Sequence, residues 1–319
     1  MNRVLSLDAY EQALRIDGPD GPKAPQHTLP SAQFLEELKE PTFVEAGGLT
    51  HAVYTFNADR LEDPSRLPVV VNLSYGYGAA SRYGALVMNA FASQMDRPVV
   101  GIDLPGVGRS SKVSTLADVL PLSLSAVARA RAEVVQKLEF EKVDVLGISL
   151  GGALAAKMAF RLGAAARQLM TFAAPGFRGD IVRSHYSGPS ASRDEALHNA
   201  YDRQAVSIDG RKAAPYRHLI HRDVTPLRDV VEARMGVGTV WAGLHRMDKL
   251  LHRTTKWYDL VGTADGSTVW QEHLAAVERR NKCVPNSSQS TVINGGGHEL
   301  SRTRIVLTAR DAEMILRLA

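Results

Sequence analysis

The chain has 319 residues, of which 45% are hydrophobic and 23% are charged, and its formal net charge at pH 7 is +4. These values are ordinary for a globular protein, and the length suffices for one large domain or for a core with an insertion. No basic run interleaved with aromatic residues is present, so nucleic-acid binding is not expected. The single cysteine, Cys283, excludes an internal disulfide framework and a cysteine-rich metal site.

The N-terminal segment lacks an apolar run of signal-peptide length, and no stretch of the sequence is apolar enough to span a membrane. The cytoplasm is therefore the expected location. Residues 1–40 are predicted to form an N-terminal extension, because the turn-forming sequence at 17–22 separates two short helical segments there. The oligomeric state stays open, with a homodimer among the alternatives.

From about residue 41 onward, short apolar segments alternate with helical patterns. Strands are predicted at residues 42–45, 51–56, 68–73, 98–102, 143–146, 168–172, 257–261 and 290–293. Helices are predicted at residues 83–94, 122–138, 150–162, 270–279 and 309–318. Continuous apolar strands that alternate with helices are typical of an α/β protein, in which helices cover both faces of a doubly wound, mostly parallel sheet.

The alternation breaks between residues 176 and 254, where helical patterns prevail. A helical insertion that follows the carboxyl end of a strand is typical of a cap, or lid, over a binding site. The alternative is a helical subdomain without a gating role. The predicted organisation is therefore an extension at 1–40, a core formed by 41–175 and 255–319, and a helical cap at 176–254.

The most informative motif is Gly147-Ile148-Ser149-Leu150-Gly151, which lies between a predicted strand and a predicted helix. A strand that passes into a helix through one residue holds that residue in a strained conformation, and the flanking glycines relieve crowding between strand and helix. The hydroxyl of Ser149 is therefore predicted at the tip of a sharp turn, beside a helix N-terminus. The alternative is a serine that only caps the helix beginning at Leu150.

A serine hydroxyl is a weak nucleophile at neutral pH and needs a base. His298 is the candidate base, because it follows the last predicted strand through three glycines at 295–297. An acid that orients the imidazole is predicted at Asp265, just beyond the strand at 257–261. Asp180 is the other candidate acid, and capping of the following helix is the alternative role of Asp265.

Charge that develops on a substrate carbonyl oxygen requires hydrogen-bond donors. The backbone N–H groups of Leu150 and Tyr77 are the predicted donors, since Leu150 opens the helix and Tyr77 lies between two glycines. The alternative for the segment around Tyr77, residues 74–78, is a plain glycine turn between a strand and a helix. Tyr75, Gly76 and Ile148 are the predicted substrate-binding residues.

Two further patterns bear on cofactors. Residues 103–110 contain two glycines but lack the G-x-x-x-x-G-K-[ST] spacing of a phosphate-binding loop, so a structured turn is predicted there. The H-E-x-x-H pattern does not occur, and no carboxylate or cysteine has metal-ligand spacing to His218 and His221. Neither a cofactor nor a metal is therefore predicted.

Together these motifs resemble those of the α/β-hydrolase fold family. The resemblance rests on residues 147–152, 103–110 and 262–265 and on Gly297-His298, and it covers nearly the whole chain from about residue 42. The chain departs from the family at Tyr75-Gly76, where His-Gly is common, so the phenol of Tyr75 is expected to alter the pocket, whereas a backbone oxyanion donor does not depend on this side chain.

The resemblance implies that Ser149 is the nucleophile, His298 the base and Asp265 the orienting acid, in the chain order that the family uses. The implied function is a serine hydrolase that cleaves a carboxylic ester, lactone or thioester of a small-molecule acyl substrate through an acyl-enzyme. The same residues also serve acyl transfer, carbon–carbon bond hydrolysis or perhydrolysis, and a receptor without catalysis is a further alternative. Dehalogenase and epoxide-hydrolase chemistry is disfavoured, because it requires a carboxylate at position 149.

Overall fold

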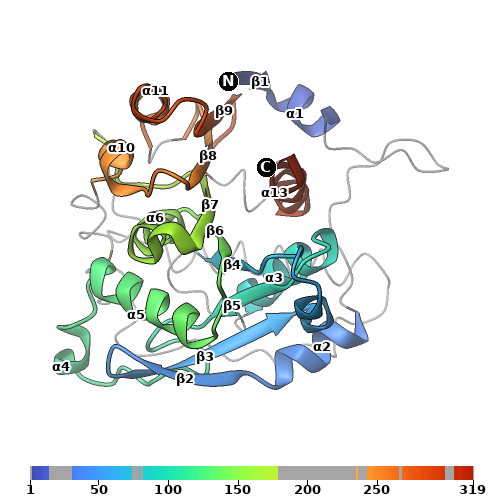
Figure 1. Ribbon diagram of the computed structural model, residues 1–319, viewed down its shortest axis with the longest axis vertical. Helices are drawn as coiled ribbons and strands as arrows, with labels where there is room; N and C mark the ends of the chain where they lie inside the picture. The colour runs from blue at the N-terminus through green and yellow to red at the C-terminus, as the bar shows by residue number, and fades with distance from the viewer. Residues whose placement is uncertain are drawn as a thin grey trace.

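The structure is a computed structural model that describes residues 2–13, 31–73, 79, 82–178, 235, 243–265, 268–298 and 305–318. In these ranges nine strands form one sheet, in the order β1-β9-β8-β7-β6-β4-β5-β3-β2 (Figure 1). The strands are β1 Arg3–Ser6, β2 Thr42–Ala46, β3 Leu49–Phe56, β4 Val69–Asn72, β5 Val99–Ile102, β6 Val143–Ile148, β7 Ala166–Phe172, β8 Lys256–Gly262 and β9 Ser288–Asn294.

The sheet is mostly parallel. Strand β3 runs antiparallel to β2 and β5, and every pairing from β5 through β4, β6, β7, β8 and β9 to β1 is parallel. The strand order reverses at β4, because the chain adds β5 on one side of β4 and β6 on the other. Open α/β sheets bind ligands beyond the carboxyl ends of their strands at such a switch point.

Helices cover both faces of the sheet (Figure 1). The α-helices are α1 Leu7–Ala13, α2 Ala32–Lys39, α3 Arg82–Gln94, α4 Leu116–Val119, α5 Leu124–Lys137, α6 Leu150–Leu162, α10 Met247–Leu250, α11 Trp270–Cys283 and α13 Ile305–Leu318. Helices α5, α6 and α11 lie on one face, and α2, α3 and α13 lie on the other (Figure 1). Among the described helices none combines the length and the apolar character that crossing a bilayer requires.

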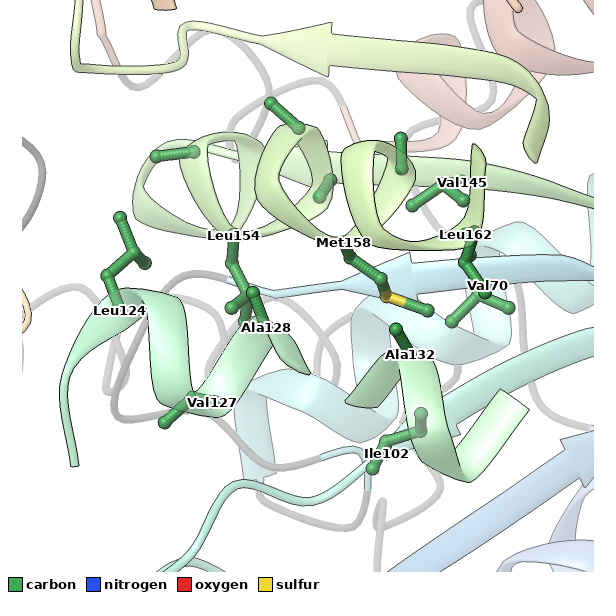
Figure 2. Close-up of a cluster of buried hydrophobic side chains, with 14 of the residues drawn as sticks. Val70, Ile102, Leu124, Val127, Ala128, Ala132, Val145, Leu154, Met158 and Leu162 are labelled. Atoms are coloured by element: carbon green, nitrogen blue, oxygen red, sulfur yellow. The ribbon is translucent and has the colours of Figure 1, made fainter. Parts of the chain in front are cut away.

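Each face of the sheet has its own apolar core, because alternate residues of a strand point to opposite faces. In β6, Val145 belongs to the core under α5 and α6, whereas Leu146 belongs to the core under α3 and α13. Figure 2 shows how α6 packs on α5: Leu154 faces Ala128, and Met158 reaches toward Ala132. The predicted doubly wound, mostly parallel α/β sheet is confirmed.

The strand β1 was not predicted. Arg3–Ser6 pairs in parallel with β9 at the edge of the sheet. Two side chains of the N-terminal segment also pack on the core: Tyr10 donates a hydrogen bond to Asp311 of α13 (3.3 Å), and Phe34 stacks on Phe56 with ring centroids 4.5 Å apart. The boundary of an N-terminal extension at residue 40 stays a prediction.

Most of the predicted cap at 176–254 lies outside the described residues, including Asp180, His218 and His221. The described ends of this insertion meet, because the N–H group of Leu244 donates to the carbonyl oxygen of Gly176 (3.0 Å). The returning chain is held by Arg280 of α11, whose guanidinium donates to the carbonyl oxygens of Leu251 and His252. The cap itself stays a prediction.

Candidate active site

Ser149 lies at the turn between β6 and α6, as the motif predicts. Its backbone has φ 54° and ψ −127°, a region that residues with a side chain rarely adopt. The N–H group of Ser149 donates to the carbonyl oxygen of Phe172 in β7 (2.8 Å), which holds the turn against the neighbouring strand. Strained backbone of this kind is characteristic of active sites, where the surrounding structure maintains it.

The glycines on either side of Ser149 let three backbones approach each other closely. A Cβ atom at Gly147 would lie 2.1 Å from the carbonyl oxygen of Gly151, and one at Gly151 would lie 2.2 Å from that of Asn72. Real Cβ atoms do not make contacts this short with backbone, so only glycine fits at these positions. The turn thus depends on direct contact between β6, the start of α6 and the end of β4.

The His298 imidazole lies next to the Ser149 hydroxyl. Nε2 of His298 is 2.8 Å from Oγ of Ser149, and the imidazole side chain is 11% exposed. His298 follows β9 through Gly295, whose φ of +78° turns the chain back over the end of the sheet. The glycine-rich loop after the last strand therefore places a base beside the serine.

Asp265 lies on the other side of the imidazole. Its Oδ2 is 2.9 Å from Nδ1 of His298, and its Oδ1 accepts the N–H group of Thr268 (3.2 Å). The Asp265 side chain is fully buried. With a carboxylate accepting the Nδ1–H proton, the neutral imidazole keeps its lone pair on Nε2, where it can accept the hydroxyl proton of Ser149.

Two neighbouring loops bring Asp265 and His298 together. The loop after β8 touches the loop after β9, since the N–H group of Ala264 donates to the carbonyl oxygen of Gly296 (2.9 Å). A Cβ atom at Gly262 would lie 2.0 Å from that same oxygen, so this contact also requires glycine. The sequence placed Asp265 and His298 after two different strands, and the structure reveals that the two loops meet.

Of the other predicted site residues, the structure describes Leu150 and Ile148. Leu150 is the first residue of α6. Ile148 is the last residue of β6, and its side chain packs in the core under α3 and α13. Tyr75, Gly76 and Tyr77 lie outside the described residues, so their roles stay predictions.

Residues 103–110 form a structured turn, as predicted. The buried carboxylate of Asp103 accepts the N–H group of Arg109 (3.0 Å) and the hydroxyl of Tyr54 (3.2 Å). A Cβ atom at Gly108 would lie 2.0 Å from Oδ2 of Asp103, so glycine lets the turn close on this side chain. The turn therefore organises the end of β5 through its own aspartate.

Sequence reasoning missed a buried polar pair beneath the site. Arg131 of α5 donates from Nη1 to Oδ1 of Asn72, the last residue of β4. The sequence does contain an indication of this pair, because Arg131 lies on the same face of the helix as Val127 and Val134, which are buried in the core. A charged residue on such a face indicates a buried partner.

A second aspartate–histidine pair was also missed. Nδ1 of His273 lies 2.9 Å from Oδ2 of Asp259, and both side chains are fully buried between β8 and α11. Asp259 also accepts the hydroxyl of Thr171 (2.6 Å), so this pair connects strands within the core. Within the described ranges no three metal-ligating side chains cluster.

A family model described as "Alpha/beta hydrolase family" matches residues 73–307. The chain is also similar to solved structures that include an N-formylmaleamic acid deformylase from Pseudomonas putida S16 (TM-score 0.58; 16% identity; 88% of this chain and 100% of that chain). Another is a thermophilic esterase from Thermogutta terrifontis (TM-score 0.56; 16% identity; 88% of this chain and 98% of that chain). A third is a meta-cleavage product hydrolase from Pseudomonas fluorescens IP01 (TM-score 0.57; 16% identity; 86% of this chain and 99% of that chain).

A comparison with curated protein sequences gives no match. Solved structures at this level of identity show the fold, and the family model shows the family. Since that model covers residues 73–307, most of the chain, the protein belongs to the alpha/beta hydrolase family.

Proposed function

We propose that this protein is a serine hydrolase that cleaves a carboxylic ester, lactone or thioester. Ser149 would be the nucleophile, His298 the general base and Asp265 the acid that orients the imidazole. The observation that carries the proposal is the hydrogen-bonded chain from Asp265 through His298 to Ser149, with contacts of 2.9 Å and 2.8 Å. The strained backbone of Ser149 adds support, because it presents the hydroxyl at the carboxyl edge of the sheet.

In the acylation step, Nε2 of His298 removes the hydroxyl proton while Oγ of Ser149 attacks the substrate carbonyl carbon. The carboxylate of Asp265 stabilises the imidazolium that forms. The tetrahedral intermediate carries a negative oxygen, for which we propose the N–H groups of Leu150 and Tyr77 as donors. The imidazolium then protonates the leaving alcohol or thiol, and the carbonyl–heteroatom bond breaks to give the acyl-enzyme.

Deacylation repeats the sequence with water in place of the hydroxyl. His298 takes a proton from water, which attacks the acyl carbon, and the proton returns to Oγ of Ser149 as the acid product leaves. If an alcohol or a peroxide replaced water, the same step would give acyl transfer or a peracid. The ratio of acid to transfer product, measured with these competing nucleophiles, therefore distinguishes hydrolysis from the alternatives.

For the substrate we propose the whole class of carboxylic esters, lactones and thioesters rather than one member of it. The similar structures include a deformylase, an esterase and a meta-cleavage product hydrolase, and an identity of 16% does not choose among them. Reactions of this family differ in the groups that surround the acyl chain rather than in the fold. A panel of p-nitrophenyl esters, lactones and thioesters of increasing acyl length is the direct way to narrow the class.

Labelling with a fluorophosphonate tests the proposal. The reagent should add one mass increment to the parent protein and none to Ser149→Ala, because only an activated serine displaces the fluoride. Ser125→Ala is the matched control, since Ser125 is an exposed serine on α5 and its loss should leave labelling unchanged. Hydrolysis of a p-nitrophenyl ester should fall by about 10⁶ in Ser149→Ala.

Two outcomes contradict the proposal. Labelling of Ser149→Ala at the parental rate would place the reactive serine elsewhere. A parent protein that is folded but neither labelled nor active on any acyl substrate would favour the receptor alternative.

A further inference from the structure

Three strands end side by side beneath the proposed nucleophile. Asn72 of β4 pairs in register with Gly147 of β6, and Val71 pairs with Gly101 of β5. Asn72 and Ile102 therefore end their strands at the same level, and Ser149 follows two residues after Gly147, which pairs with Asn72. Strand β6 leads directly into Ser149, and β5 leads into the turn at 103–110.

The guanidinium of Arg131 connects two of these strand ends. Arg131 is 2% exposed, and it donates from Nη1 to Oδ1 of Asn72 and from Nη2 to the carbonyl oxygen of Ile102. Both acceptors belong to the last residues of their strands. A planar group with several fixed donors is suited to holding two acceptors at a set separation.

Asn72 extends the connection to the third strand. Its Nδ2 donates to the carbonyl oxygen of Leu146 in β6 (3.2 Å), three residues before Ser149. Its backbone carbonyl oxygen is the atom against which Gly151 packs. Asn72 thus touches the nucleophile turn on both sides, from the strand that enters it and from the helix that leaves it.

A buried cation contributes little net stability to a core. Taking a guanidinium out of water is unfavourable, and apolar residues of similar volume often stabilise a fold equally well or better. Stability alone therefore gives little reason for a charge at this position. The geometry of the bonds to Asn72 and Ile102 gives a stronger one, because they set the ends of β4 and β5 relative to each other, and Asn72 then connects them to β6.

We propose that Arg131 and Asn72 are positioning residues for the turn between β6 and α6, which carries Ser149 and the proposed oxyanion donor, the N–H group of Leu150. They fix the end of β4 against Leu146 and Gly151, which lie on either side of this turn. The N–H group of Leu150 must point at the developing oxyanion, so a small shift of β4 against β6 weakens the binding of the transition state. This inference rests on the proposed function.

His298 and Asp265 stand on the loops after β9 and β8, and neither loop follows a strand that Arg131 and Asn72 connect. A shift of β4 should therefore lower kcat while the pH profile of kcat keeps its parental shape. It should also leave KM within about threefold, because the oxyanion donors act in the transition state rather than on bound substrate.

The test compares Arg131→Met, Asn72→Leu and the double variant in the full-length protein. Fluorophosphonate titration counts the intact sites, so that kcat refers to folded, reactive protein only. Each single variant removes one hydrogen-bond partner of a buried polar side chain and should lose stability, whereas the double variant removes both polar side chains and should recover part of it. The kcat of the double variant should nevertheless stay 10- to 100-fold below the parent, which a purely structural role would not produce.

Asn72→Asp has nearly the same volume and keeps an acceptor for Arg131, but it cannot donate to Leu146, and its kcat should fall about tenfold. If Arg131→Met and Asn72→Leu do not fold, the kcat of Asn72→Asp still tests the positioning role. Arg129→Met, at an exposed position of the same helix, is the control and should retain the parental kcat.

Parental kcat per titrated site in the double variant and in Asn72→Asp would overturn this inference while leaving the proposed function intact. A parent protein without a titratable serine would overturn the proposed function, and this inference with it. Reduced kcat with an unchanged pH profile and a steady KM supports the inference.

Discussion

Nδ1 of His298 lies 2.9 Å from Oδ2 of Asp265, although the two residues stand on loops that leave different strands. The contact determines which imidazole nitrogen carries the proton. In the proposed mechanism it must leave Nε2 free to accept the proton of Ser149, 2.8 Å away.

Asp265→Asn should lower kcat for ester hydrolysis by about 10⁴ while the fold is retained. The amide group of asparagine can donate to Nδ1, and this favours the tautomer with the proton on Nε2, which cannot act as the base. Asp59→Asn, at an exposed position of the 3₁₀ turn Ala58–Glu62, is the control and should keep the parental rate. A loss smaller than tenfold in Asp265→Asn would argue against an orienting role for Asp265.

Ser149→Gly should stabilise the protein relative to Ser149→Ala by about 1 kcal/mol or more. Both variants lack the hydroxyl, but alanine keeps the Cβ atom that is strained at φ 54°, and glycine does not. Urea denaturation of the two variants measures the difference directly. Equal unfolding free energies would mean that the backbone of Ser149 stores no strain.

Gly151→Ala should lower the free energy of unfolding by about 1–3 kcal/mol and abolish activity. In an ordinary helix this change would stabilise, so the expected sign is opposite to that of helix propensity. The reason is that the new methyl group would lie 2.2 Å from the carbonyl oxygen of Asn72, which is backbone and cannot turn aside.

Gly297→Ala is the matched comparison for this steric argument. The nearest atom to its added methyl group is 4.0 Å away, so the unfolding free energy should change little. Differential scanning calorimetry on the two variants checks the prediction, which fails if both lose the same stability.

Asp311→Asn should change the pH dependence of stability. The Asp311 carboxyl accepts hydrogen bonds from Tyr10 and Tyr258, and burial raises its pKa to about 6 from an ordinary value near 4. Between these values the folded protein holds a proton that the unfolded chain releases. The folded state is therefore penalised above about pH 6, and the penalty disappears as the pH falls toward 4.

Asparagine is neutral throughout this range and carries no such penalty. The unfolding free energy of Asp311→Asn, taken relative to the parent, should therefore rise between pH 4 and pH 6 by about 3 kcal/mol and stay constant above. Glu278→Gln, at an exposed position of α11, is the control and should give a flat difference. A flat difference for Asp311→Asn as well would contradict the prediction.

Local pattern was sufficient for most of the fold. The predicted strand at 168–172 is β7 Ala166–Phe172, and the predicted helix at 150–162 is α6 with the same bounds. Such agreement arises because buried parallel strands are continuous apolar runs, and helices repeat their apolar residues every three to four positions. The strand β1 escaped because its four residues are mostly exposed and carry no such pattern.

The chain by itself determined the chemistry of the nucleophile turn, since the glycines that it requires are neighbours of Ser149 in sequence. Only the tertiary structure decided which carboxylate faces His298, because that depends on two loops meeting across a contact between Ala264 and Gly296. It likewise decided the partners of Arg131, whose acceptors lie on two other strands. Contacts between distant segments depend on the register of the sheet and on the packing of its helices. No local sequence pattern determines either of these.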